Sequence, residues 1–174
     1  SSSCGLCGTE AIEELVKRIS PVEPAESLSE AVLLRVVDAM AGHQPVFDRT
    51  GGLHAAAAFD STGMILEARE DIGRHNAVDK VVGRMLLDRQ LPATGLGLFV
   101  SGRASFEMVQ KAWAAGFTAV VAVSAPSALA VQAALSAEMQ LAGFARNGTL
   151  NVYAANRQPD EPATDSVAEG EPVS

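Results

Sequence analysis

Two short apolar segments, Leu96–Val100 and Thr118–Val123, are the feature that most limits how this chain can fold. Each has the length of a strand that is buried on both faces, and each is followed by a turn and a helical pattern. Alanine and valine fill the core positions and aromatic residues are few, which is typical of helices packed closely on a parallel sheet. We therefore expect an α/β domain with three layers, helices on both faces of one sheet.

Hairpin patterns on either side of these segments predict that the sheet is mixed. Leu53–Phe59 and Met64–Arg69 flank a polar turn, and Leu141–Ala145 and Thr149–Tyr153 flank Asn147-Gly148, a strong type I′ turn pair. Helices are expected at about 9–19, 27–40, 76–89, 105–116 and 127–138. The capping box Ser27-Leu28-Ser29-Glu30 opens the second of them. The apolar stripe of the third consists of Ala77, Val78, Val81, Val82, Met85 and Leu86.

Composition divides the chain into one domain, residues 1–154, and an acidic tail, residues 155–174, which we expect to be disordered. The net charge is −8, and about half of it comes from the tail. An acidic chain is a poor partner for nucleic acid.

The apolar stretch 117–135 is interrupted by Ser124 and Pro126, so it predicts strand, turn and helix rather than a membrane span. No signal peptide is visible, and we expect a cytoplasmic protein.

Cys4-Gly5-Leu6-Cys7 contains the only two cysteines of the chain. Four interpretations compete for this C-x-x-C motif. A structural zinc site needs four ligands, and His43, His54 and His75 lack the required spacing. A disulfide is disfavoured in the cytosol, and a thioredoxin-like dithiol lacks its preceding strand. The fourth is a pair of solvated thiols on a flexible terminus. Chemical use is favoured over that last alternative, because a thiolate attacks sulfur and can hold it as a persulfide.

Small, hydroxyl-bearing and basic residues gather where the expected strands end. Helix N-termini direct free N–H groups outward, glycine lets the backbone approach an anion, and arginine binds phosphate through two hydrogen bonds. Several such loops favour an anionic ligand over simple helix capping. Neither a P-loop nor a Rossmann fingerprint is present.

For His75 we favour a ligand or proton-transfer role over a solvated loop position, whereas His54 can equally face the site or the core. The candidate residues are Arg74, His75, Ser101, Gly102, Arg103, Ser105, Ser124, Arg146, Asn147 and Gly148.

Segments 50–56, 69–80, 101–107 and 123–127, together with the C-x-x-C, closely resemble the formate dehydrogenase accessory sulfurtransferase family, FdhD/NarQ. The resemblance runs from Ser2 to about Tyr153. The mostly β segment that precedes the C-x-x-C in that family has no counterpart in this sequence. Members of the family have a fold similar to cytidine deaminases and look like homodimers. Zinc is not expected, because His75-Asn76-Ala77 and Ser101–Ser105 lack the H-x-E and P-C-x-x-C ligands of a deaminase.

The resemblance also implies a function. Family members take sulfur from a cysteine desulfurase as a persulfide on the C-x-x-C, here Cys4 and Cys7. They pass it to the molybdenum (or tungsten) bis-pterin guanine dinucleotide cofactor of formate dehydrogenase. The cofactor-binding segment of the family matches Phe144-Ala145-Arg146-Asn147-Gly148-Thr149, and GDP should mimic the cofactor. A chaperone that binds this cofactor without moving sulfur is the alternative.

Overall fold

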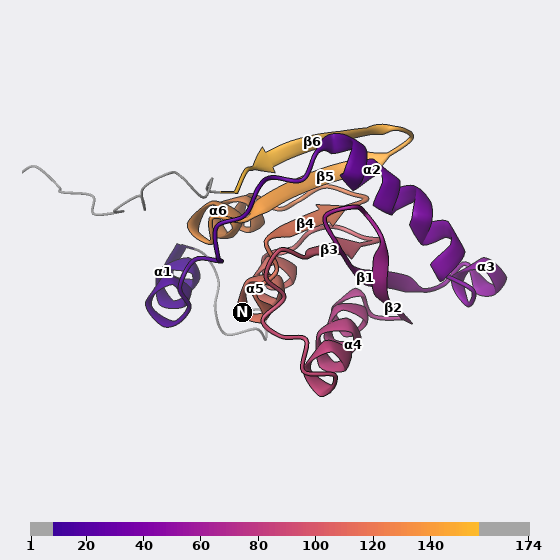
Figure 1. Cartoon of the computed structure of the whole chain (residues 1–174), viewed down its shortest axis with the longest axis horizontal. Coiled ribbons are helices and arrows are strands. Elements are labelled where there is room, and N and C mark those ends of the chain that lie inside the picture. Colours follow the sequence, from indigo (N-terminus) through magenta and orange to yellow (C-terminus); the bar gives the residue numbers. More distant parts are fainter. Residues whose placement is uncertain (1–8, 157–174) are drawn as a thin grey trace, which may run out of the picture.

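A six-stranded sheet in the order β2-β1-β3-β4-β5-β6 forms the centre of the computed structural model, which describes residues 9–156 (Figure 1). The strands are β1 (His54–Phe59), β2 (Ile65–Asp71), β3 (Gly97–Val100), β4 (Ala119–Ala122), β5 (Gln140–Arg146) and β6 (Thr149–Ala154). The helices are α1 (Thr9–Arg18), α2 (Glu30–Ala39), the 3-10 helix η1 (Met40–His43), α3 (Phe47–Thr50), α4 (Arg74–Leu87), α5 (Phe106–Ala115) and α6 (Ala128–Ser136). Cys4 and Cys7 lie outside the described residues.

Strand directions confirm the predicted mixed sheet. β3 pairs parallel to β4 and β4 parallel to β5, whereas β1 is antiparallel to both β2 and β3, and β6 is antiparallel to β5. Because β1 is antiparallel to each of its neighbours, β2 points in the same direction as the three parallel strands. The carboxyl ends of β2, β3, β4 and β5 therefore share one edge of the sheet.

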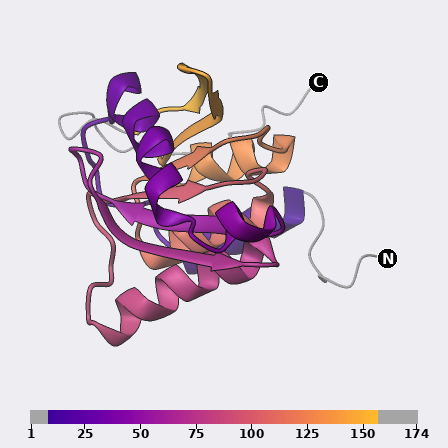
Figure 2. The same ribbon diagram turned by 90° about the vertical axis from the view of Figure 1, so that its right-hand side faces the viewer.

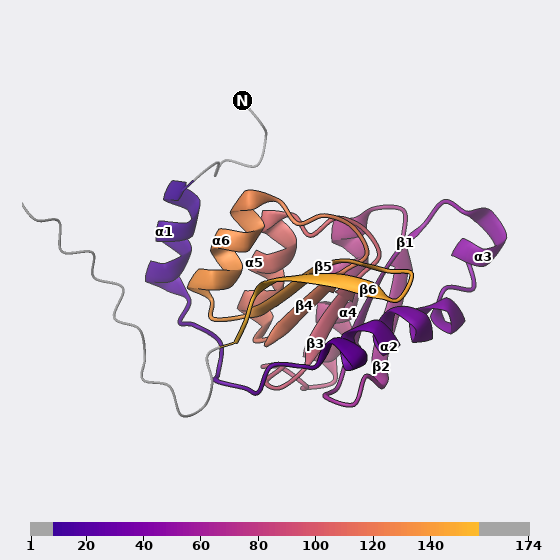
Figure 3. The ribbon, with the colours of Figure 1, turned by 90° about the horizontal axis from the view of Figure 1, so that it is seen from above.

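Each face of the sheet is covered by its own set of helices. Ala56 and Ala58 of β1 belong to the larger core under α4, α5 and α6, and Ala55 and Ala57 belong to a second core with Phe59. Figure 2 shows α2 and α4 on opposite sides of the sheet. The small side chains of β1 let the helices approach it closely. Figure 3 shows α1 beside α6, which it contacts, far from β2.

Several boundaries differ from the sequence predictions. The third helix was expected to begin at about residue 76, but α4 already begins at Arg74, because the Gly73 carbonyl accepts from Ala77 N (3.0 Å) and starts the helix. The cap of α2 is Ser29, whose Oγ accepts from Val32 N, rather than Ser27. Leu86, placed on the apolar stripe of α4, is 63% exposed.

Asn156 is the last residue of the chain that the structure describes. It is buried, and its Oδ1 accepts from Gln140 N (2.5 Å), so the folded unit includes at least the first two residues after β6. The rest of the predicted tail lies outside the described residues. Within residues 9–156, no helix combines the length and the apolar character needed to cross a membrane.

Gly97 should not tolerate a side chain. A Cβ at this position would lie 2.1 Å from Cζ of the fully buried Phe59. We expect Gly97→Ala to reduce the free energy of unfolding by about 1–3 kcal/mol, because the packed ring has little room to move. Gly42→Ala is the control, since a Cβ there would meet no atom of residues 9–156 within 4 Å. Urea denaturation should separate the two variants, and equal stabilities would contradict the packing described for Phe59.

Asp71 ties the end of β2 to the start of α4, and its carboxyl should titrate at unusually low pH. A hydrogen bond from Lys80, then those from Gly73 N and Asn76, lower its pKa from 3.8 to about 2. A lowered pKa adds stability above the unfolded-state value of about 4, and this contribution is lost as the pH falls from about 4 to about 2. Asp71→Asn should flatten the pH dependence of unfolding in that window. An NMR titration that places the Asp71 pKa near 4 would contradict this contact set.

Candidate functional site

Every predicted ligand loop within residues 9–156 lies at one edge of the sheet. The segments after β2, β3 and β4 and the β5–β6 turn all fall there, because these strands end at that edge. The start of β1 lies there too, since His54 pairs with Asp71. Backbone hydrogen bonds join neighbouring loops, from Ser124 N to the Gly102 carbonyl (3.3 Å) and from Ser127 N to the Ala104 carbonyl (3.0 Å). The edge is thus a continuous surface built from three helix starts and one turn.

A cavity of about 250 Å³ opens between the first turn of α4 and the loops that precede α5 and α6. Of the predicted site residues it brings together Arg74, Arg103 and Ser105. The remaining lining residues are Ala104, Ala125, Pro126 and Ser127. Two arginines and two serines around a small cavity at three helix N-termini are donors suited to a phosphate-sized anion.

Arg74 carries the clearest indication of a ligand. Its Nε is buried and has no hydrogen-bond partner among the described residues. Burying a guanidinium N–H without a partner costs free energy, so such groups are rare outside functional sites. An anion in the adjoining cavity would satisfy this donor.

His75, Ser105 and Glu107 form a cluster beside Arg74. The His75 Nε2 lies 3.5 Å from the Ser105 Oγ and 3.9 Å from a Glu107 carboxylate oxygen. Both contacts involve the same ring nitrogen, so the arrangement is not a nucleophile–base–acid triad, which uses both nitrogens. The pKa of Glu107 is lowered by its own backbone N–H, then by Ser105, His75 and Arg74. Glu107 therefore places a carboxylate beside the basic groups that an anionic ligand would use.

Ser101 and Gly102 lie beside this cavity rather than in its lining. The Ser101 Oγ accepts from Ala55 N (2.8 Å) and lies 3.4 Å from the His54 Nδ1, so it fixes the start of β1. A Cβ on Gly102 would lie 3.5 Å from the His54 ring and 3.7 Å from Arg74 Cδ. His54 and Ser101 line a second, more apolar cavity of about 510 Å³ with Phe47 and Phe99. Gly102 thus separates the two cavities.

The predicted segment Phe144–Thr149 reaches the same edge by a distorted strand. Phe144 has a φ of 53°, rare for a residue with a side chain, at a bulge in β5, and its N–H donates to the Ser124 carbonyl (3.2 Å). Asn147 and Gly148 both have positive φ, as the predicted type I′ turn requires. Arg146 is exposed and does not line the 250 Å³ cavity. Such rarely populated backbone conformations cluster at functional sites, which agrees with a role for this segment at the edge.

Two residues of the site were not predicted from the sequence. Ser127 was left out of the candidate residues. Its Oγ caps α6 by accepting from Ala130 N (3.1 Å), and the residue also lines the cavity. Glu107 was also left out of the candidate residues, although it contacts His75. Each lies one turn or less from a residue that was selected, and that proximity could have indicated both. Among residues 9–156, no group of three or more His, Cys, Asp or Glu side chains could hold a metal ion.

Comparisons with known proteins identify the family of this chain. The model of the FdhD/NarQ family matches residues 1–159. The sulfur carrier protein FdhD of Streptomyces avermitilis is 47% identical over 161 residues, which cover 91% of this chain and 57% of that protein. The protein of the same name from Nocardia farcinica is 50% identical over 155 residues, covering 88% of this chain and 56% of that protein.

A solved structure with a similar fold supports the same family. The crystal structure reported for a formate dehydrogenase accessory protein of Desulfotalea psychrophila superposes with a TM-score of 0.72 at 26% identity. It covers 82% of this chain, and this chain covers 60% of it. The chain therefore spans little more than half the length of the proteins that it matches. Its sequence and its α/β fold show that it belongs to the FdhD/NarQ family.

Proposed function

We propose that this chain carries sulfur from a cysteine desulfurase to the bis-pterin guanine dinucleotide cofactor of a formate dehydrogenase. The observation that carries the proposal is the buried Nε of Arg74, which has no hydrogen-bond partner among residues 9–156 and lies beside a cavity of helix N-termini. Such a donor calls for an anion such as phosphate. The names of the relatives supply the link to sulfur. The C-x-x-C at Cys4 and Cys7 supplies the thiols.

The transfer of sulfur by the two cysteines needs no outside oxidant, because the sulfur arrives from the donor as a persulfide. The Cys4 thiolate attacks the outer sulfur of the donor persulfide, forms a new S–S bond and releases the donor thiolate. The Cys7 thiol then attacks the inner sulfur of the Cys4 persulfide. This step closes a Cys4–Cys7 disulfide and releases the outer sulfur as hydrosulfide, with one proton. A cellular dithiol must afterwards reduce the disulfide. The C-x-x-C spacing serves the release step, because it lets the Cys7 sulfur reach the Cys4 persulfide.

The strand-end cavity would hold a phosphate of the cofactor. Arg74 and Arg103 supply positive charge, and Ser105 and Ser127 supply hydroxyl groups. The β5–β6 turn, with Arg146, lies at the same edge, where it would contact the nucleoside part of the ligand. The metal atom is cargo of the reaction, and molybdenum and tungsten suit the proposal equally. We further propose a homodimer that works in the cytoplasm.

A chaperone that binds the cofactor and moves no sulfur is the competing function. The exposed position of Arg146 and the cavity fit both functions equally, since each needs nucleotide binding. The C-x-x-C favours sulfur transfer, because a purely binding protein has no use for two neighbouring thiols.

Cys4→Ala should abolish persulfide loading, because the substituted chain lacks the nucleophile that attacks the donor. After incubation with a cysteine desulfurase and cysteine, intact-mass spectrometry of the unsubstituted chain should show a gain of one sulfur, about 32 Da. Cys7→Ala should still load and should retain the persulfide for longer, since the release step is removed. Full loading of Cys4→Ala would exchange the roles of the two thiols, and no loading of the unsubstituted chain would favour the chaperone.

Arg74→Ala should weaken binding of GDP about tenfold to a hundredfold, corresponding to the loss of a charge-assisted contact of about 1.5–3 kcal/mol. Arg84→Ala is the matched control, because Arg84 lies in the last turn of the same helix and pairs with Asp88 (2.8 Å). Isothermal titration calorimetry measures both. Equal affinities in the two variants would remove the Arg74 cavity from the nucleotide site.

A further inference from the structure

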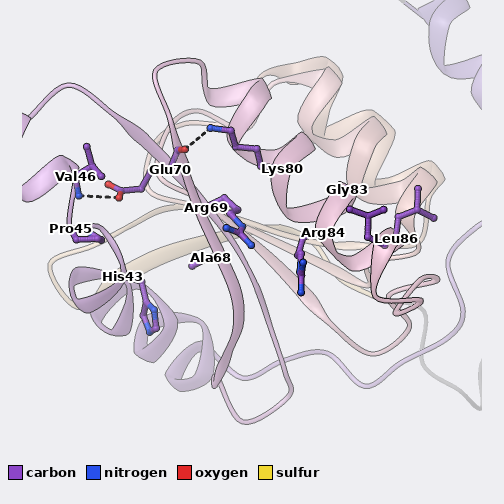
Figure 4. A pocket seen from close by; sticks show the side chains of 11 residues that line it. His43, Pro45, Val46, Ala68, Arg69, Glu70, Lys80, Gly83, Arg84 and Leu86 are labelled. Carbon is purple, nitrogen blue, oxygen red and sulfur yellow. Dashed lines mark hydrogen bonds between the residues drawn. The ribbon is translucent and has the colours of Figure 1, made fainter.

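Two cavities offer basic side chains to a small anion, and they differ in what those side chains already contact. The larger is a groove of about 920 Å³ along the edge strand β2, where Figure 4 shows Arg69, Lys80 and Arg84. Each of these three cations already forms an ion pair with a neighbouring carboxylate, that of Glu67, Asp71 and Asp88 respectively. A small anion would have to displace these carboxylates, so the groove is a poor site for it.

The 250 Å³ cavity at the strand ends is different. The Nε of Arg74 is buried and has no hydrogen-bond partner among residues 9–156, and Arg103, Ser105 and Ser127 line the same space. The volume of this cavity lies below the range of about 300–1,000 Å³ that is typical of pockets for drug-sized ligands. A small space with guanidinium and hydroxyl donors therefore suits a single tetrahedral oxyanion.

Helix α1 leads from the C-x-x-C to the same edge of the sheet. It contacts α6, and Val22 N donates to the Ala137 carbonyl (3.0 Å) beyond the C-terminal ends of the two helices. Figure 3 shows these helices side by side, with the chain entering each of them from the same end. They have nearly equal lengths, ten and nine residues. Helix α1 therefore begins beside the start of α6, where Ser127 lines the cavity.

Only a short length of chain separates the two cysteines from α1. Cys7 is two residues before Thr9, and Cys4 is five residues before it. An extended chain spans at most about 3.6 Å per residue, so covalent length alone keeps Cys7 within about 7 Å of Thr9 and Cys4 within about 18 Å. The axes of two packed helices lie about 8–10 Å apart. The tether of Cys4 is therefore long enough to bring its thiol to the cavity.

We propose that this cavity also binds thiosulfate and that Cys4 takes sulfur from it, which makes the chain a thiosulfate sulfurtransferase as well as a carrier served by a desulfurase. The inference rests on the proposed function, because it requires a persulfide on Cys4. Thiosulfate is a tetrahedral divalent anion, like hydrogen phosphate, with a sulfur atom in the place of one oxygen. Its three oxygens suit the donors of Arg74, Arg103 and Ser105. Its outer sulfur is the atom that a thiolate attacks.

The transfer step balances in atoms and electrons. The Cys4 thiolate attacks the outer sulfur of thiosulfate and forms a new S–S bond, while the S–S bond of thiosulfate breaks. The electron pair of the broken bond leaves with sulfite, so the total charge does not change and no proton, oxidant or reductant is needed. Arg74 and Arg103 favour the step, because their positive charge offsets the repulsion between a thiolate and a divalent anion.

Incubation with thiosulfate, in the absence of any desulfurase, tests the proposal. The Cys7→Ala chain is used, because it retains the persulfide. Intact-mass spectrometry should show a gain of one sulfur, about 32 Da, and an equal amount of sulfite should appear. Inorganic phosphate should slow the loading by competing for the cavity, and sodium chloride at the same ionic strength should slow it less. This comparison needs no substitution in the cavity, so it does not depend on how such a variant folds.

Arginine variants in the same Cys7→Ala chain locate the site. Arg74→Ala should reduce the initial rate of loading by about tenfold or more at low thiosulfate concentration, because a charge-assisted contact is lost. Arg84→Ala is the matched control and should load normally, since Arg84 lies in the same helix, lines the 920 Å³ groove and pairs with Asp88.

Three results would overturn the proposal: no loading by thiosulfate, equal rates in the two arginine variants, or no competition by phosphate beyond the effect of salt. Loading by a cysteine desulfurase and cysteine, measured in parallel, separates this inference from the proposed function. A chain that the desulfurase loads and thiosulfate does not load keeps the proposed function and loses only the inference. A chain that neither donor loads loses both.

Discussion

Strand β1 is antiparallel to both of its neighbours, and the architecture of the site depends on this constraint. It turns β2 into the direction of β3, β4 and β5, so that loops far apart in the sequence meet at one edge. The alanines of β1 make this possible, since they are buried on both faces and let α2 and α4 pack closely on either side. Had β1 been parallel to β3, the Asp71–Arg74 junction would lie at the opposite edge, away from Ser105 and Ser127.

Charge at this edge is balanced rather than simply positive. Arg74 and Arg103 face the cavity, whereas Glu107 lies next to His75 and accepts from its own backbone N–H at the start of α5. A carboxylate in this place stabilises the empty site, because it partly neutralises the arginines and the helix terminus. An incoming phosphate has to compete with it. Such a site favours a ligand with several negative charges over a single weak anion.

The sequence was sufficient to predict the elements whose patterns are local. The apolar strands β3 and β4, the Asn147-Gly148 turn and the α6 cap at Ser127 follow from residue types at fixed spacing. The start of α4 was placed too late, because Gly73 caps it by backbone geometry and no capping side chain marks it. The exposure of Leu86 could not be foreseen, since helical periodicity does not reveal which neighbour is missing at a sheet edge.

The site was predictable in its composition and less so in its geometry. Arg74, Arg103 and Ser105 do line one cavity, but Ser101 bonds to the start of β1 and Arg146 remains exposed outside the lining. These differences depend on loop conformations of two or three residues, which residue type alone does not determine. The roles of Cys4 and Cys7 stay predictions, since both lie outside the described residues.

The most direct test of the central claim, that the strand-end cavity is the ligand site, is NMR mapping of GDP on the backbone amides. We expect the largest shifts in segments 102–105 and 124–127 and in the first turn of α4, because their N–H groups surround the cavity. The amides of β2 and of the last turn of α4 should not move. Shifts concentrated in the 920 Å³ groove along β2, or none at saturating GDP, would contradict the claim.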